Sequence, residues 1–142
     1  MKRLTILTVV FNFLIVVGAG HGIGFLGFIE IVLFNYLKYD FSFSPFANYN
    51  QSLAAVGLFA LIGQIILLIS LTVKIYRFLF WIKLLGLIFL WTSFYYLTHT
   101  ILSSTLAGIS FISGLPFFIC SILLFLRVIR EEYINRKEVR QI

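Results

Sequence analysis

The basic residues of this chain fall in three short clusters, separated by apolar stretches that are long enough to cross a bilayer. They are Lys2 and Arg3, then Lys74, Arg77 and Lys83, then Arg127, Arg130, Arg136, Lys137 and Arg140. Only Lys38 lies outside the clusters. Because Lys and Arg are enriched on the cytoplasmic side of membrane proteins, all three clusters are expected on that side. The chain must then cross an even number of times between clusters, and both termini are predicted to be cytoplasmic.

Composition supports a membrane protein. The chain is 61% hydrophobic and 11% charged, whereas a soluble domain is roughly 25% charged. With about 20 apolar residues needed for each spanning helix, 142 residues leave room for four spans and for no soluble catalytic domain. An enzyme is therefore not favoured. The net charge of +6 is explained by membrane insertion and by anionic lipid headgroups, so no nucleic-acid partner is expected.

The spans are predicted at about residues 4–20, 53–73, 78–96 and 102–126. The sequence thus predicts an all-α integral membrane protein with a four-transmembrane-helix bundle in a single domain, residues 1–142. An outer loop is expected at 39–52 and a cytoplasmic tail at 127–142. The bias towards Phe, Ile and Lys suggests a bacterial source, and hence a bacterial cytoplasmic membrane.

Residues 22–38 are apolar enough to span, but a fifth crossing would place the later basic clusters outside. Glu30 and Lys38 fall on one edge of a helix drawn through this segment, with Asn35 beside them. This pattern favours a helix in the outer interface, with its apolar side in lipid. A re-entrant segment and a continuation of the first helix above the membrane are the alternatives.

Small and amide residues predict the faces on which helices pack. Pairs of small residues four apart let helix backbones approach closely in lipid, where the hydrophobic effect does not drive association. Two amides near the middle of their spans could form an interhelical hydrogen bond worth about 0.6 to 2 kcal/mol. The sequence leaves open whether these contacts form within one chain or between chains. The predicted packing residues are Gly20, Gly24, Gly57, Gly63, Ser104, Gly108, Ser110, Gly114, Asn12 and Gln64.

The two histidines are the strongest candidates for a ligand site. On the predicted topology His21 ends the first span and His99 ends the third, both at the outer side. Two imidazoles can be axial haem ligands, and with Glu30 they could hold a metal ion or pass protons. The plainer interpretation is that each histidine is an interfacial residue hydrogen-bonded to headgroups, water or carbonyl groups.

No motif identifies a reaction, a ligand or a cofactor. Gly22, Gly24 and Gly27 match a dinucleotide-binding fingerprint, but the strand, helix and acidic residue that this motif needs are not indicated. We therefore expect a non-catalytic accessory subunit of a homo-oligomer or of a larger membrane complex, with other membrane-protein chains or copies of itself and the lipid bilayer as partners. The alternatives are a haem-, metal- or small-ligand-binding protein and an oligomeric channel or carrier.

Overall fold

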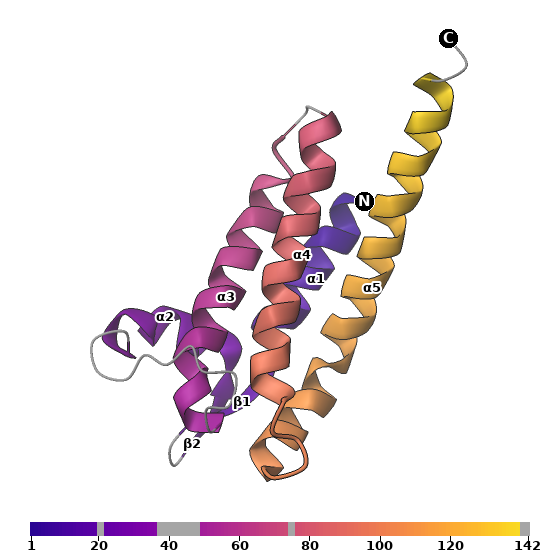
Figure 1. Ribbon diagram of the computed structural model, residues 1–142. Coiled ribbons are helices and arrows are strands. Elements are labelled where there is room, and N and C mark those ends of the chain that lie inside the picture. The colour runs from indigo at the N-terminus through magenta and orange to yellow at the C-terminus, as the bar shows by residue number, and fades with distance from the viewer. Residues whose placement is uncertain (20–21, 37–48, 74–75, 140–142) are drawn as a thin grey trace.

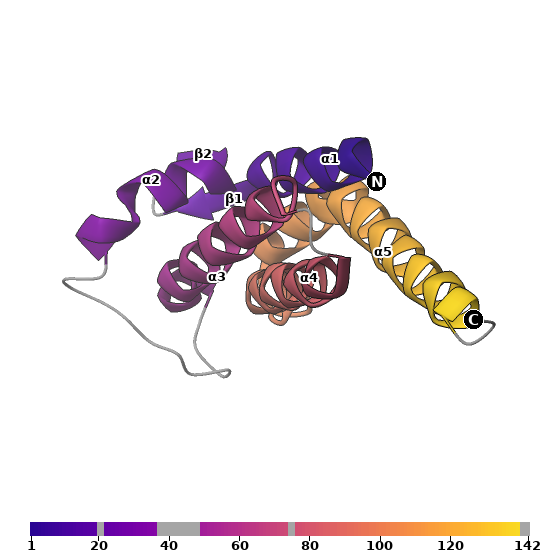
Figure 2. The same cartoon turned by 90° about the horizontal axis from the view of Figure 1, so that it is seen from above.

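A computed structural model describes residues 1–19, 22–36, 49–73 and 76–139. The described chain is mostly helical, with one short β-hairpin (Figure 1). The elements are α1 (Lys2–Phe13), β1 (Val16–Ala19), β2 (Gly22–Phe25), α2 (Leu26–Tyr36), α3 (Tyr49–Ile69), α4 (Tyr76–Thr98) and α5 (Thr105–Val139). Seen from above, α1, α3, α4 and α5 surround a common core, and α2 lies at the side away from α5 (Figure 2).

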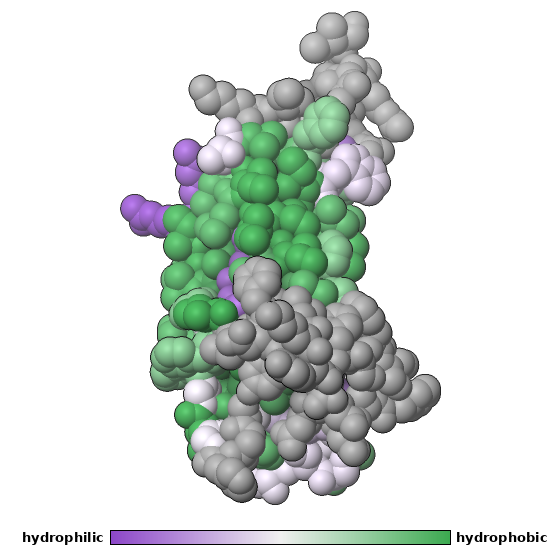
Figure 3. Space-filling view, turned by 90° about the vertical axis from the view of Figure 1, so that its left-hand side faces the viewer, coloured by the Kyte–Doolittle hydropathy of each residue, from purple (hydrophilic) through white to green (hydrophobic). Residues whose placement is uncertain are grey.

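Three of these helices are long and apolar enough to span a membrane. The qualifying segments are Ser52–Ile69 in α3, Phe78–Thr98 in α4 and Thr105–Ile134 in α5. They overlap the second, third and fourth spans predicted from sequence, at 53–73, 78–96 and 102–126. A space-filling view shows a broad hydrophobic surface across the middle of the molecule (Figure 3). The chain is thus compatible with a lipid environment.

Helix α1 has a polar buried side and an apolar exposed side. Its fully buried residues are Thr5, Thr8 and Asn12. Its exposed apolar residues are Ile6, Leu7, Val10 and Phe13. A surface helix of a water-soluble protein has the opposite arrangement, with its apolar stripe facing the core. An apolar exterior around a polar interior makes the outer side of α1 compatible with contact with lipid.

The first predicted span and the all-α fold class need correction. A continuous helix was expected over residues 4–20, but α1 ends at Phe13 and the chain then forms an antiparallel hairpin that pairs Val16 with Phe25 and Ala19 with Gly22. β-Branched valines favour strands. Each glycine in a helix interior also costs about 1 kcal/mol relative to alanine. These local preferences explain why the helix ends before this glycine-rich segment.

Side chains from two long helices satisfy the backbone of β1 on the side that does not pair with β2. The Val16 amide donates to Ser113 Oγ at 3.0 Å, and the Gly18 amide donates to Tyr49 Oη at 3.2 Å. Tyr49 Oη also lies 2.9 Å from Ser110 Oγ. Unpaired backbone groups are costly in an apolar environment, so these contacts let a strand pack among the helices.

The helix predicted over residues 22–38 is shorter than expected and packs against the bundle. It begins at Leu26 and ends at Tyr36, and it packs against α3. Glu30 was expected on a polar edge at the outer interface, but its side chain is only 5% exposed. Lys38 and most of the predicted outer loop fall within residues 37–48, which lie outside the described residues.

The closest backbone approach that involves a predicted packing residue is between α3 and α4. A Cβ atom added to Gly63 would lie 3.0 Å from the carbonyl oxygen of Gly86 and 2.7 Å from Leu90 Cδ2. A Cβ atom on Gly86 would lie 3.2 Å from the carbonyl oxygen of Gly63. Farther along the same pair, Ser93 Oγ donates to the carbonyl oxygen of Val56 at 2.8 Å. Two facing glycines thus bring these helices together.

Aromatic packing joins α4 to α5. Phe94 stacks against Phe111 and Phe118, and a Cβ atom at Gly114 would clash with the Phe94 ring. Trp91 Nε1 donates to Ser121 Oγ at 2.9 Å. The small residues of α5 therefore accept the large rings of α4.

Candidate functional site

Three polar side chains from three helices meet in the core of the bundle. Gln64 in α3 donates from Nε2 to Asn12 Oδ1 in α1 at 2.9 Å and to Glu30 Oε1 in α2 at 2.7 Å. Asn12 is fully buried, and Glu30 and Gln64 are 5% and 6% exposed. We call Asn12, Glu30 and Gln64 the carboxyl–amide cluster.

The local fold explains how the cluster forms. Asn12 continues the buried polar side of α1 and lies in its last turn. The β-hairpin then reverses the chain, and the Leu26 amide donates to the carbonyl oxygen of Ile15 at 2.8 Å, where α2 begins. The buried residues Leu26, Ile29 and Glu30 share one side of α2. Packing of α2 against α3 therefore carries Glu30 to Gln64.

The hydrogen bonds of the cluster are not all satisfied. Both hydrogens of the Gln64 amide are donated, one to each partner. Within the described part of the chain, Asn12 Nδ2 is buried and has no hydrogen-bond partner. A buried donor without a partner costs about 1 to 3 kcal/mol. The cluster therefore has one unused donor in this arrangement.

The electrostatic environment of Glu30 favours its neutral form. Glu30 belongs to α2, which is not among the three helices able to span a membrane. Burial raises the pKa of its carboxyl from the ordinary value of 4.5 to about 7, and the hydrogen bond from Gln64 acts in the opposite direction. The carboxyl therefore gains or loses its proton near neutral pH.

The structure does not bring the predicted histidine and carboxylate ligands together. Ser52 Oγ in α3 donates to the carbonyl oxygen of Tyr96 at 3.3 Å, so His99 lies near the level of Ser52. Gln64, the partner of Glu30, lies about 18 Å from Ser52 along the axis of α3, at a rise of 1.5 Å per residue. His99 Nδ1 lies 2.9 Å from the carbonyl oxygen of Tyr96. Glu30 and His99 are therefore at different levels of the bundle.

The other half of the predicted haem or metal site cannot be placed. His21 lies outside the described residues. Among the residues that are described, no three His, Cys, Asp or Glu side chains are grouped so that they could hold a metal ion. The pairing of His21 with His99 therefore stays a prediction.

The predicted packing residues have different surroundings. Gly57 is buried, Gly63 faces α4 and Gly114 faces Phe94. A Cβ atom at Gly24 would meet Phe28 at 3.8 Å, which is ordinary contact. Ser110 is buried against Tyr49, whereas Ser104 is half-exposed and a Cβ atom at Gly108 would meet nothing within 4 Å. Gly20 lies outside the described residues.

Sequence reasoning missed three parts of this core. Thr5, Thr8 and Asn12 are separated by three and four residues, which places them on one side of a helix. The sequence therefore contained the signal for the polar side of α1. Gly86 has no small residue four positions away in its own helix, so the spacing used to find packing faces did not identify it. The position of Glu30 depends on the hairpin that reverses the chain, and helical periodicity carried no signal for that reversal.

The fold and the cluster together define a mostly helical protein with three helices suited to a membrane and a carboxyl group buried among neutral amides. Comparison with protein-family models, with curated proteins and with solved structures finds no match for this chain.

Proposed function

We propose that this chain is a small membrane protein that binds and releases a proton at Glu30, as a proton-coupled subunit of a homo-oligomer or of a larger membrane complex. The observation that carries the proposal is the burial of the Glu30 carboxyl, 5% exposed, with the neutral Gln64 amide as its hydrogen-bond partner. Ionisable side chains inside a helical membrane bundle are costly, and they commonly mark proton or ion pathways.

The two amides can serve both protonation states of Glu30. When the carboxyl is ionised, Gln64 Nε2 donates to it and to Asn12 Oδ1, as observed. When the carboxyl is protonated, its O–H needs an acceptor, and rotation of the Gln64 amide by half a turn presents Oε1 instead. Rotation of the Asn12 amide then lets Nδ2, which lacks a partner in the observed arrangement, donate to the same oxygen.

A proton fits this cluster better than a metal cation. In the observed arrangement the Gln64 amide directs its N–H groups towards Glu30 Oε1 and Asn12 Oδ1. Those hydrogens carry partial positive charge and oppose a cation between the two oxygens. Rotation of the Gln64 amide would still offer a cation at most four side-chain oxygens, fewer than the roughly six to eight ligands that magnesium or calcium takes. A proton needs only one acceptor, which the rotated amide supplies.

The proposed topology has four crossings with both termini in the cytoplasm. Its support is that Met1 and Arg127 line one groove, which places the start of α1 beside the C-terminal part of α5. At the standard rise per residue α1 is about 18 Å long and β1 about 13 Å. Together they match a hydrocarbon core of about 30 Å. Helix and strand would then make the first crossing jointly, and reporter fusions at each terminus test their location.

The proton site is tested by infrared difference spectroscopy on the protein in lipid vesicles. Titration through neutral pH should reveal a protonated-carboxyl stretching band that is lost at high pH. Glu30→Gln should remove this band, whereas Glu131→Gln, which alters a half-exposed acid on α5, should leave it. A band that persists in Glu30→Gln would overturn the assignment.

A second measurement asks whether the proton crosses the membrane. Vesicles that contain the protein and a pH-sensitive dye should acidify when a membrane potential drives protons inward, and Glu30→Gln should abolish this flux. If the carboxyl titrates but no flux is seen, Glu30 binds a proton without conducting it, and coupling must involve another chain.

A second candidate function is packing in an oligomer without proton binding. Gly108 favours it, because a Cβ atom at this small residue of α5 would meet no atom of the described residues within 4 Å. Gly108→Cys in a Cys120→Ser background should then form a disulfide between chains in the membrane. Ser110→Cys in the same background is the matched control, because Ser110 is buried within the chain.

A further inference from the structure

A groove between α1 and α5 combines basic and apolar side chains. It has a volume of about 780 Å³ and is lined by Met1, Lys2, Arg3, Leu4, Leu7, Leu123 and Arg127. This size falls within the range of small-molecule sites, roughly 300 to 1,000 Å³. We propose that this groove binds one anionic phospholipid, with its phosphate at Lys2, Arg3 and Arg127 and an acyl chain along the leucines.

The order of residues along the two helices matches the shape of a lipid. Lys2 and Arg3 begin α1, and Leu7 lies about one turn farther along. In α5, Leu123 lies one turn before Arg127. Because all of these residues line one groove, its bases gather at one end and its leucines continue into the apolar zone. Leu7 and Leu123 are 44% and 50% exposed, so their side chains are available to an acyl chain.

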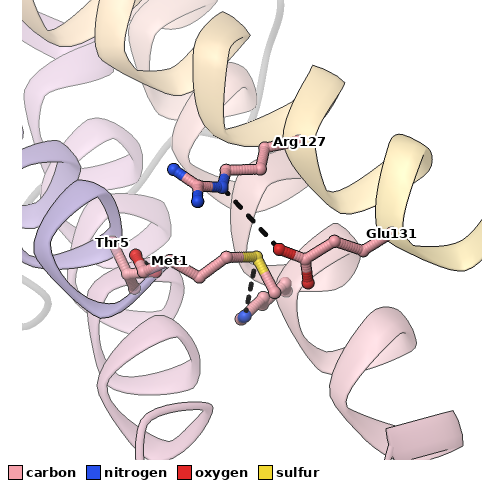
Figure 4. Close-up of polar contacts among 5 residues, drawn as sticks. Met1, Thr5, Arg127 and Glu131 are labelled. Atoms are coloured by element: carbon pink, nitrogen blue, oxygen red, sulfur yellow. Dashed lines mark hydrogen bonds and ion pairs between the residues drawn. The ribbon is translucent and has the colours of Figure 1, made fainter.

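The charges favour an anionic headgroup over a zwitterionic one. Three bases line the groove, and no acid lines it among the residues that the structure describes. Glu131 lies 3.7 Å from Arg127 Nε, one turn along α5 (Figure 4). The Arg127 side chain is 57% exposed and has further N–H donors for a phosphate. The first-turn amides of α1 add a partial positive charge at the same end.

A neighbouring groove supplies a matched control. It lies on another side of Arg127 and is lined by Leu123, Leu126, Arg127, Arg130, Glu131 and Ile134, with a volume of about 560 Å³. It contains an acid and no residue of α1. Arg130→Gln therefore removes one base from the same end of α5 without changing the proposed site.

The test is thermal unfolding of the protein in a non-ionic detergent, with added phosphatidylglycerol or phosphatidylcholine. Phosphatidylglycerol should raise the unfolding temperature of the wild type in a saturable manner, and phosphatidylcholine should have little effect. The double variant Arg3→Gln and Arg127→Gln should bind phosphatidylglycerol roughly thirtyfold more weakly, since each base near an anionic surface contributes about a factor of five. Arg130→Gln should behave like the wild type.

Three results would overturn the proposal. Equal stabilisation by phosphatidylcholine would mean that the groove recognises acyl chains without the phosphate. An equal loss of binding in Arg130→Gln would mean that overall positive charge, and not this groove, attracts the lipid. Glycerol phosphate, which lacks acyl chains, should not stabilise the wild type, and stabilisation by it would assign the groove to a free phosphate compound instead.

Discussion

The burial of Glu30 predicts how stability should depend on pH. Replacement by glutamine keeps the size of the side chain and an oxygen that can accept from Gln64, but removes the ionisable proton. The pKa of Glu30 rises on folding from 4.5 to about 7. A shift of this size corresponds to about 3 kcal/mol between the two protonation states.

The sign follows from proton linkage. Below pH 4.5 the carboxyl is protonated in both the folded and the unfolded chain, so its contribution to stability is fully present. Between pH 4.5 and 7 the unfolded chain loses this proton while the folded chain keeps it, so the free energy of unfolding falls as pH rises. Above pH 7 the loss is complete and constant. The Glu30→Gln variant should not show this decline.

Reversible unfolding in mixed micelles, followed by far-ultraviolet circular dichroism from pH 4 to 8, measures the effect. The free energy of unfolding of Glu30→Gln minus that of the wild type should increase by up to about 3 kcal/mol between pH 4.5 and 7. Taking the difference between the two unfolding free energies cancels the contributions of groups that titrate in both proteins. Glu131→Gln is the control and should give a nearly constant difference. Parallel pH curves for Glu30→Gln and the wild type would refute the inference that burial disfavours the ionised form of Glu30.

Three other substitutions test the packing and the hydrogen bonds. Gly86→Ala should lower the free energy of unfolding by about 1 to 3 kcal/mol, because its Cβ atom would lie 2.9 Å from Leu67 Cδ2; Gly108→Ala, in open space, should change it little, and equal effects would contradict the contact. Tyr49→Phe should cost about 1 to 3 kcal/mol in the same unfolding assay, because it removes the acceptor of a β1 amide, and a neutral result would mean that another group accepts that bond. Lys83→Met should change the unfolding free energy little, since burial to 3% exposure with only the weak Met1 thioether as acceptor opposes the attraction between the Lys83 charge and Glu131; a large loss would show that this attraction outweighs the cost of burial.

The long helices could be predicted from sequence because each is a continuous apolar segment. The expected span 78–96 falls within α4, which the structure assigns to Tyr76–Thr98. The expected span 102–126 overlaps α5, which begins at Thr105 and continues to Val139. In such segments the hydrophobic signal and the helical signal agree, so only the boundaries differ. The number of crossings and the side on which the termini lie depend on the membrane and stay predictions.

The N-terminal segment could not be predicted in this way because hydropathy does not distinguish an apolar helix from an apolar strand. Residues 4–20 are mostly apolar, yet the helix ends at Phe13 and Val16–Ala19 form a strand. The relevant signal is local conformation, namely valines and glycines in a short stretch. A prediction from hydropathy alone ignores these preferences and therefore misses the strand.

The candidate site shows that polar residues carry more positional information than apolar ones in such a chain. Apolar residues occupy both the core and the lipid-facing surface, so their spacing does not identify the buried side of a helix. The spacing of Thr5, Thr8 and Asn12 does identify it, because all three are fully buried. The same reasoning assigns Gln64 to the core, where it can meet Asn12. It fails for Glu30, since a charged residue at an apolar helix edge is equally consistent with the interface and with a buried site. Only the hairpin between α1 and α2 decides between these two positions, and this makes the hairpin the structural basis of the proposed proton site.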